Sequence, residues 1–254
     1  MLVTLGSNTI IGASASQTFQ YACNSVQKIF IRCDDDSTDS LRGNVTIQIG
    51  NDVVVNDIPF RPLSLISLLN GGGNSDTADS YFSVDIGSHV LEPLENLYVT
   101  IRNSGATHSM TAVDVAAIVN EGGVYEPLKW TNYSDNVFTD SNTLSIFAWA
   151  DATLENDTSA FTIRNQAYSA TPQVQSGVNV SLTKIQGNHD QAKKIACLGD
   201  NQVPLDTSIN YTSSTIDGVV CISAMEKFSG KAQASKKAGQ AVLSSMTSKE
   251  RKAL

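Results

Sequence analysis

Residues 25–70 read SVQKIFIRCDDDSTDSLRGNVTIQIGNDVVVNDIPFRPLSLISLLN, and this stretch decides the expected fold. Its first part alternates, so that Ile29 and Ile31 share one face while Phe30 and Arg32 share the other. Residues 44–49 alternate in the same way, which is the period-two pattern of a half-buried strand. A Gly-Asn-Asp turn then leads into three valines, so the pattern predicts a β-hairpin.

The end of this stretch changes period and predicts a short helix. Apolar side chains recur every third residue at Leu63, Ile66 and Leu69. Pro62 suits a first helical turn, and Asn70 followed by three glycines ends the helix. The expected order is therefore strand, acidic loop, hairpin and helix.

Short apolar runs separated by Ser, Thr, Asn, Asp and Gly continue through most of the 254 residues, which favours an all-β protein. Residues 2–13 predict an edge strand or an arm. Further strands are expected at 17–23, 81–86, 97–101, 110–120, 144–149, 160–164, 178–185, 195–198, 207–211 and 218–225. No apolar run approaches the roughly 20 residues that span a bilayer. The first residues also lack the basic start of a secretory signal, so we expect neither segment.

A weak internal repeat suggests two duplicated halves. Residues 29–51 (IFIRCDDDSTDSLRGNVTIQIGN) and 146–166 (IFAWADATLENDTSAFTIRNQ) share the same order of strand, acidic loop and strand. This period is far longer than a solenoid unit and fits two domains of seven or eight strands each. Eight antiparallel strands in two facing sheets make a jelly roll. The predicted fold is therefore all-β, with two jelly-roll barrels in tandem (a double jelly roll), short helices and a basic C-terminal helical tail.

The expected boundaries follow from this repeat. The first barrel covers 1–123, an inter-barrel crossing 124–139, the second barrel 140–226 and the basic tail 227–254. Residues 124–141 are expected to be irregular because Pro127 and several Asn and Asp residues interrupt them. The apolar phase of the strands predicts that the cores contain Val45, Ile47, Ile49, Val84, Val99, Ile101, Val115, Ile146, Phe161, Ile163, Val180, Ile209, Val220 and Ile222.

Charge is distributed unevenly along the chain. The formal net charge is −8, but residues from Lys227 onward carry seven basic side chains and one acid, Glu250, which gives this tail +6 and leaves −14 for residues 1–226. An acidic body argues against direct, sequence-specific binding of nucleic acid. Two interpretations of the tail stay open: a solvated tail, or an inward-facing helix that meets acidic lipid headgroups or a neighbouring subunit.

The order of elements resembles the double jelly-roll major capsid proteins of tailless, membrane-containing icosahedral phages, the corticovirus and tectivirus lineage. Four segments carry the resemblance: residues 28–55, 62–70, 94–123 and 205–228. The basic tail after Phe228 departs from it. The resemblance implies a major capsid (coat) protein that forms pseudo-hexameric trimers and tiles an icosahedral virion shell. It also implies synthesis in the host cytoplasm, location in the virion, and contacts with other copies and with penton or minor capsid proteins. Contact with internal membrane lipid through Lys227–Leu254 is expected from the charge of the tail, if the tail is an inward-facing helix.

The acidic loop is the one candidate metal site. Asp34, Asp35, Asp36 and Asp39 could collect a calcium ion, since hard cations take carboxylate oxygens, but the loop lacks the glycine and final glutamate of an EF-hand. A solvated loop is the alternative. Beyond calcium, no cofactor is expected.

We expect no catalysis and nominate no catalytic or cofactor-binding residue. His189 beside Asp190 reads as an ordinary surface pair. Trp130 and Trp149 suit a core or interface better than a sugar platform. Cys23, Cys33, Cys197 and Cys221 lack metal-binding spacing and are expected as free thiols, with a Cys23–Cys33 bridge as the alternative.

Three alternatives to the capsid protein described above remain at this stage. A picorna-like single jelly-roll capsid protein would place the LSIFAW strand of residues 144–149 near its C-terminus. A phage receptor-binding spike built from two sandwiches would be a minor virion component. A carbohydrate-active sandwich enzyme would need two acids across a cleft, and the sequence nominates no such pair. For association between copies, residues Tyr125, Trp130, Tyr133 and Phe138 are the candidate apolar contact.

Overall fold

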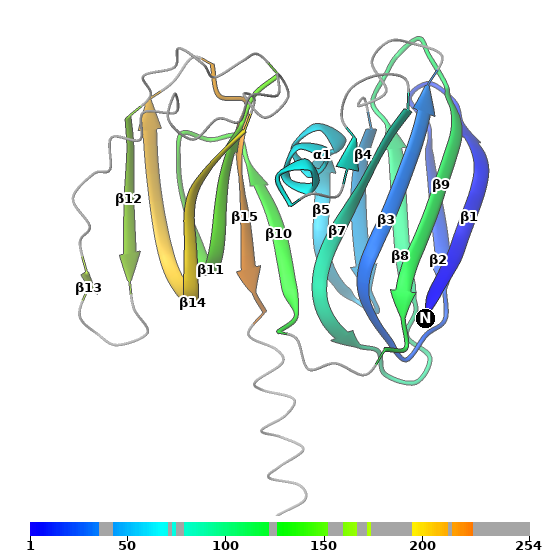
Figure 1. The fold of residues 1–254 in the computed structure, drawn as a ribbon, viewed down its shortest axis with the longest axis horizontal. Helices are drawn as coiled ribbons and strands as arrows, with labels where there is room; N and C mark the ends of the chain where they lie inside the picture. The colour runs from blue at the N-terminus through cyan, green and yellow to red at the C-terminus, as the bar shows by residue number, and fades with distance from the viewer. Residues whose placement is uncertain are drawn as a thin grey trace, which may run out of the picture. The chain divides into compact units, whose positions relative to one another are not determined.

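A computed structural model describes residues 1–35, 43–70, 73–74, 79–121, 126–151, 160–166, 172–173, 195–212 and 215–225. Contacts divide the chain into one unit of residues 1–224 and a second of residues 225–254. The first unit is built from strands and one helix, and its elements are shown in Figure 1. Within the described residues, no helix is long and apolar enough to cross a membrane.

The first half of the chain contains two antiparallel sheets. One has the order β1-β9-β3-β7-β6, formed by β1 (Leu2–Ile11), β9 (Met110–Val119), β3 (Ser25–Asp35), β7 (Asp79–Val90) and β6 (Gly73–Asn74). The other begins β2-β8-β4-β5, formed by β2 (Ser16–Tyr21), β8 (Leu97–Asn103), β4 (Gly43–Ile49) and β5 (Asp52–Pro59). Successive strands cross between the two sheets except at the pairs β4–β5 and β6–β7, each of which stays in one sheet, and this is the pattern of a jelly roll. The expected edge strand at residues 2–13 is β1, which lies at the end of its sheet.

Helix α1 (Phe60–Leu69) follows the predicted hairpin of β4 and β5. Pro59 precedes its first residue and Asn70 caps its end, where the Asn70 amide donates to the Ile66 carbonyl. Seven of its ten residues are buried, because the helix packs on β7 and also contacts β5, β11 and β14. The change of period in the sequence therefore located this helix correctly.

The described residues of the second half form another jelly roll, in which β11 and β14 are long strands. Its strands are β10 (Leu128–Tyr133), β11 (Val137–Trp149), β12 (Ala160–Gln166), β13 (Pro172–Gln173), β14 (Ile195–Thr212) and β15 (Gly218–Ala224). The start of β11 pairs with the end of β14, which also pairs with β12. The rest of β11 pairs with β15 and with the start of β14. β11 and β14 therefore each belong to two groups of paired strands, β10-β15-β11-β14 and β11-β14-β12-β13, which form the two layers of the second jelly roll. Since the chain contains two jelly rolls, the single jelly-roll alternative is wrong.

The repeat marks equivalent places in the two halves. Ile29 lies in β3 and Ile146 in the second part of β11, and each strand is followed by an acidic loop and then by β4 or β12. The strands expected at 195–198 and 207–211 are one continuous strand, β14. The strand expected at 178–185 lies outside the described residues. The four domain boundaries remain a prediction.

The prediction of irregular backbone over 124–141 is wrong. Residues 128–133 form β10, and β11 begins at Val137. β10 pairs along its length with β15, and Trp130 also meets Val55 of β5 in a single parallel pair. Pro127 immediately precedes β10, where its missing N–H breaks no ladder. Asp135 and Asn136 lie in the short turn between β10 and β11, whereas Asn132 and Asp140 are half-buried and accept hydrogen bonds from side chains of this chain.

The predicted core residues are largely confirmed. Ten are buried in β4, β7, β8, β9, β11, β12 and β14: Val45, Ile47, Ile49, Val84, Val99, Ile101, Val115, Ile146, Ile163 and Ile209. Val220 of β15 is also buried, as predicted, whereas Ile222 is half-buried. The prediction missed the other face of β15, where Val219 and Cys221 join the second core. The side chains of Phe161 and Val180 lie outside the described set.

Candidate functional site

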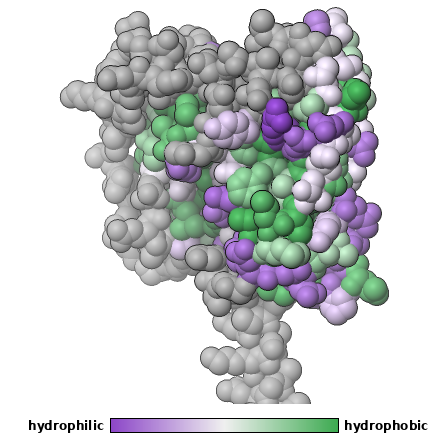
Figure 2. Space-filling view, turned by 45° about the vertical axis from the view of Figure 1, so that its right-hand side comes forward, coloured by the Kyte–Doolittle hydropathy of each residue, from purple (hydrophilic) through white to green (hydrophobic). Residues whose placement is uncertain are grey.

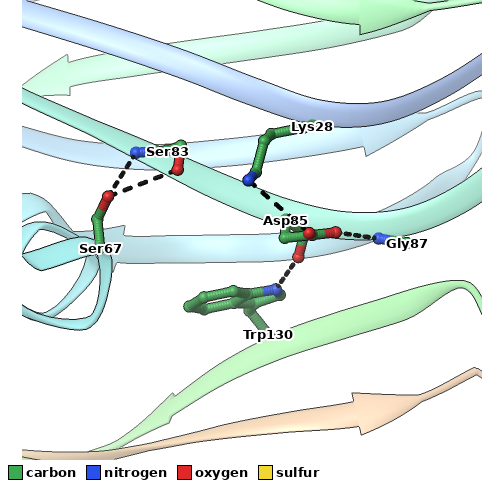
Figure 3. A network of polar contacts seen from close by, with 6 residues as sticks. All are labelled: Lys28, Ser67, Ser83, Asp85, Gly87 and Trp130. Atoms are coloured by element: carbon green, nitrogen blue, oxygen red, sulfur yellow. Dashed lines mark hydrogen bonds and ion pairs between the residues drawn. The ribbon is translucent and has the colours of Figure 1, made fainter. Parts of the chain in front are cut away.

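The residues that join β7 to β10 form the first polar cluster of interest, shown in Figure 3. Trp130 of β10 is 3% exposed, and its indole Nε1–H donates to the Asp85 carbonyl oxygen of β7 at 2.7 Å. The Asp85 carboxylate accepts from the Gly87 amide at 3.0 Å and lies 4.0 Å from the Lys28 ammonium. Trp130 is therefore an internal joint between the two jelly rolls and not a sugar platform.

Gly87 allows the two backbones at this joint to approach closely. Its φ of +70° lies in the left-handed region, which favours glycine. A Cβ atom placed on Gly87 would lie 1.9 Å from the Glu126 carbonyl oxygen and 3.0 Å from Pro127 Cα. Only a residue without a side chain fits between β7 and the segment that leads into β10.

His89 adds a titratable group to the same joint. It is 8% exposed, and its Nε2 lies 3.3 Å from the Leu128 carbonyl oxygen. A carbonyl oxygen only accepts, so this contact requires the tautomer with the proton on Nε2. Burial lowers the pKa of His89, which is opposed more weakly by backbone hydrogen bonds to Leu128 and Ile86 and by the charge of Asp52.

Helix α1 is tied to β7 by a smaller contact in the same view. The Ser83 amide donates to the Ser67 hydroxyl at 3.1 Å, and the two hydroxyl oxygens are 3.5 Å apart (Figure 3). Ser67 is almost fully buried. The serine therefore satisfies a backbone donor of β7 at the point where an all-apolar helix would leave that donor unpaired.

A second polar cluster lies where β11 passes from one sheet to the other. The Asp140 carboxylate accepts hydrogen bonds from the hydroxyls of Tyr133 at 2.8 Å, of Thr143 at 2.7 Å and of Ser223. Burial raises the pKa of Tyr133, and the bond to Asp140 adds to this. Burial also raises the pKa of the nearby Cys221 thiol. One carboxylate thus holds β10, β11 and β15 together.

The metal prediction is not tested by the structure. Asp34 and Asp35 end β3, but their side chains lie outside the described set, as do Asp36 and Asp39 altogether. Among the described residues, no group of three His, Cys, Asp or Glu side chains is placed to hold a metal ion. Calcium at the acidic loop stays a prediction. The pair His189 and Asp190 also lies outside the described residues.

The four cysteines are free thiols. Cys33 and Cys221 are buried, whereas Cys23 and Cys197 are half-buried. The alternative of a Cys23–Cys33 bridge is therefore wrong. Burial raises the pKa of the Cys23 thiol.

The aromatic residues proposed for contact between copies are largely buried inside their own chain. Phe138 is buried in the second core, and its ring stacks on Tyr133 with centroids 4.0 Å apart. Trp130 is at the joint, and Trp149 is 6% exposed and donates to the Asn132 side chain at 2.9 Å. For Trp130 and Phe138, which are buried within their own chain, the prediction of an intermolecular contact is wrong, whereas for the half-buried Tyr133 it stays a prediction. Tyr125 lies outside the described residues.

Sequence reasoning missed Asp85, Gly87, His89 and Asp140. The one usable signal was Gly87, because a glycine inside an alternating strand often marks a close backbone approach. The others occupy ordinary strand positions and gain their roles only from partners far away in the chain. Both clusters bind backbone and hydroxyl groups of this chain, so their chemistry supports the fold.

Comparison with known proteins shows which solved structures have a similar architecture. No known family model matches the sequence, and no curated protein matches it. Among solved structures, the STIV major capsid protein matches with a TM-score of 0.54 at 9% identity, covering 88% of this chain and 95% of that chain. The chain has the double jelly-roll fold of viral capsid proteins.

Two further matches have the same extent. A chain of the atomic structure of Sulfolobus Turreted Icosahedral Virus matches with a TM-score of 0.55 at 10% identity, covering 88% of this chain and 89% of that chain. The major capsid protein P2 from bacteriophage PM2 matches with a TM-score of 0.50 at 11% identity, covering 89% of this chain and 98% of that chain. The likeness therefore includes both jelly rolls of this double jelly roll, although identity is low throughout.

Proposed function

We propose that this chain is a major capsid protein, a subunit that forms pseudo-hexameric trimers and tiles the icosahedral shell of a virion. The observation that carries the proposal is the extent of the fold likeness. The match to the STIV and PM2 capsid proteins covers 88–89% of this chain and 95–98% of those chains.

The internal chemistry supports a structural role for the double jelly roll. The polar clusters around Asp85 and Asp140 are occupied by backbone amides, hydroxyls and an indole of the same chain. Such hydrogen-bond clusters hold the strands of the two jelly rolls in one fixed arrangement. A shell subunit needs rigidity of this kind, because its contacts with neighbours depend on a constant shape.

Partners and location follow from the same proposal. The chain would lie in the virion shell and contact other copies of itself, together with penton or minor capsid proteins. The basic residues of Lys227–Leu254 would meet internal membrane lipid, whose acidic headgroups attract Lys and Arg. Membership of the corticovirus and tectivirus lineage is part of the proposal. The PM2 and STIV proteins match this chain with similar TM-scores, so the fold itself does not choose between them.

The test is the abundance of this chain in purified particles. Quantitative mass spectrometry of gradient-purified virions should find it as the most abundant shell protein, and cryo-electron microscopy should show three copies in each pseudo-hexameric unit. A receptor-binding spike would instead be a minor component. Finding the chain in low copy number, or outside the shell, would overturn the proposal.

A further inference from the structure

The outer face of the β1-β9-β3-β7 sheet is unusually apolar for a surface. Phe30 of β3 lies beside Ala116 of β9 in the ladder, and Leu2 of β1 lies beside Ile118 of β9. Tyr81 and Leu2 are 51% and 65% exposed. Figure 2 shows hydrophobic side chains gathered on this side of the first jelly roll with hydrophilic ones around them. Exposed apolar patches with a polar rim mark sites of interaction.

A shallow hollow lies over the centre of this face. It has a volume of about 660 Å³, and its lining includes Thr4, Phe30, Tyr81 and Ala116. Phe30 alternates with the buried Ile29 and Ile31, so its ring points away from the barrel core. The ring is half-buried, so part of it stays open to a contact outside the chain.

The charges described on this face cancel one another. Lys28 lies 4.0 Å from the Asp85 carboxylate, and Arg32 lies 3.4 Å from the Asp114 carboxylate. Among the side chains that the structure describes on this face, each of the two cations thus lies beside an anion, which leaves no excess positive charge there, while residues 1–226 carry −14. A copy of this acidic chain would be repelled by most of the body but could approach here.

The outer face of the opposite sheet provides the contrast. Thr18 and Thr100 share a hydrogen bond at 2.9 Å, the Asp57 amide donates to the Thr46 hydroxyl at 3.1 Å, and Arg102 pairs with Asp57 at 2.7 Å. Hydroxyl and ionic groups therefore cover that sheet, as expected for a surface in water. The two outer faces of the first jelly roll therefore differ in chemistry. The polar face of β2, β8, β4 and β5 suits contact with water, whereas the apolar face of β1, β9, β3 and β7 suits contact with another protein surface.

The geometry points to the outer face of β1, β9, β3 and β7, centred on Phe30 and Ala116, as a subunit interface that a second copy of this chain covers. The inference rests on the proposed function and adds to it the surface on which copies meet. An apolar centre with a paired polar rim is the usual anatomy of a protein interface. The described side chains of the rim carry no excess positive charge, which favours a copy over a membrane or nucleic acid, because both of these are bound by surfaces with excess positive charge.

Association should occur through the face of this sheet and not along its edge. The exposed edge is β1, whose pairing with β9 is interrupted by three register shifts. Asn8 in the same strand has a φ of +48°. Bulges of this kind prevent an edge strand from pairing with another chain. The remaining way to cover the apolar residues is packing of side chains against the sheet.

The test compares two substitutions that change net charge equally. Phe30→Glu adds an acid at the centre of the proposed interface, and Thr100→Glu adds one to the outer face of the opposite sheet. Sedimentation of the full chain should show association weakened by about tenfold or more in Phe30→Glu, as for loss of a central aromatic anchor, and little changed in Thr100→Glu. Circular dichroism and thermal unfolding check that both variants fold. Equal association of the two folded variants would overturn the inference.

A labelling experiment decides the question even where Phe30→Glu fails to fold. Thr4→Cys, made together with Cys23→Ser and Cys197→Ser, puts a thiol on the exposed rim of the hollow. This thiol should react with a maleimide in the monomer and be protected in assembled protein. A photocrosslinker attached to it should capture peptides of the same sequence from another copy. An unprotected thiol, or capture of a different protein or of lipid, would overturn the inference.

Failure of the proposed function would look different. Wild-type protein that stays monomeric in every condition, including those in which particles form, would overturn both the capsid proposal and the interface. Wild-type protein that assembles while Phe30→Glu assembles equally well, or while the thiol at position 4 stays reactive, would overturn the interface alone.

Discussion

Asp140 is the residue at which three strands of the second jelly roll meet. Its carboxylate accepts from three hydroxyls, two of which come from β10 and β15. Hydrogen bonds to an ionised acceptor are about twice as strong as neutral ones, and removing the acceptor leaves the donors unpaired. The register of β11 shifts just after this residue, so the cluster sits where the strand must bend.

Replacing Asp140 by alanine should therefore destabilise the fold. We expect Asp140→Ala to lower the free energy of unfolding by about 2 kcal/mol, since several partly buried hydroxyls lose one charged acceptor. Asp135→Ala, in the exposed turn before β11, should change it by less than about 0.5 kcal/mol. Urea unfolding followed by circular dichroism measures both. Equal effects would show that the cluster at Asp140 contributes nothing beyond a surface acid.

The core of the first jelly roll offers a second prediction at this scale. Ile47 is fully buried in β4, so Ile47→Asp would leave an unpaired carboxylate in an apolar environment. The cost should be about 4 kcal/mol or more, enough to prevent soluble expression. Val53→Asp is the matched control, because Val53 on the neighbouring strand is 39% exposed. Soluble Ile47→Asp protein with a normal unfolding midpoint would contradict the assigned core.

His89 predicts a dependence of stability on pH. Its pKa is lowered in the folded protein by burial, so the unfolded state binds the proton more readily. Stability is therefore complete above the unfolded pKa of about 6.5 and falls as pH drops from there toward the lowered folded value. His89→Gln keeps a donor for Leu128 and should lose less stability between pH 7 and pH 5.5 than the wild type. His108→Gln, at an exposed position, should behave like the wild type.

Strands that bury alternate residues could be predicted from the sequence. Strands that are buried on both faces, or that pair in two sheets, could not. β4 and β8 each bury alternate residues, and their phases were assigned correctly. β15 buries residues on both faces, so alternation carries no information about which face belongs to its own core. β14 serves in both sheets along its 18 residues, and the polar middle that looked like a loop is part of the strand.

The joint between β7 and β10 was hidden for a similar reason. Trp130 and Asp85 are separated by 45 residues and belong to different jelly rolls. Local patterns identify strands, but they do not identify which strand end meets which. Pro127 was read as the sign of an irregular crossing, whereas it only marks the residue before β10. Gly87 was the one local sign of this long-range contact, because a glycine inside an alternating strand often marks a close approach of two backbones.

Gly87 gives the prediction at the scale of these elements. Gly87→Ala should destabilise the joint by about 2 kcal/mol, because the new Cβ would meet the Glu126 carbonyl and the left-handed φ would be strained. Gly12→Ala is the control, since the nearest atom to its Cβ would be 4.0 Å away. Differential scanning calorimetry compares the two variants. An unchanged melting temperature for Gly87→Ala would show that the two backbones can separate freely.

At the scale of the whole molecule, charge opposes the association that a shell requires. Residues 1–226 carry −14 and residues 227–254 carry +6. Copies of such a body attract each other only where apolar contacts or opposite charges outweigh the repulsion. The outer face around Phe30, whose described charges are paired, supplies a place for contact, and the basic tail reduces the net charge of each copy.

Removing residues 227–254 should thus keep the fold and make association more dependent on salt. The strands and helix described above belong to a unit that ends at Ala224, so the truncated chain should unfold at the wild-type temperature. Without the +6 tail, copies repel more strongly until salt screens them, with a screening length of about 10 Å at 0.1 M and about 3 Å at 1 M. Sedimentation across this salt range should show the truncated protein associating only at the higher concentrations. A full-length variant with the seven basic tail residues changed to glutamine should behave like the truncation, because it keeps the length of the tail and loses its charge. If it instead behaves like the wild type, the tail acts through its length or contacts, and its charge has no part in assembly.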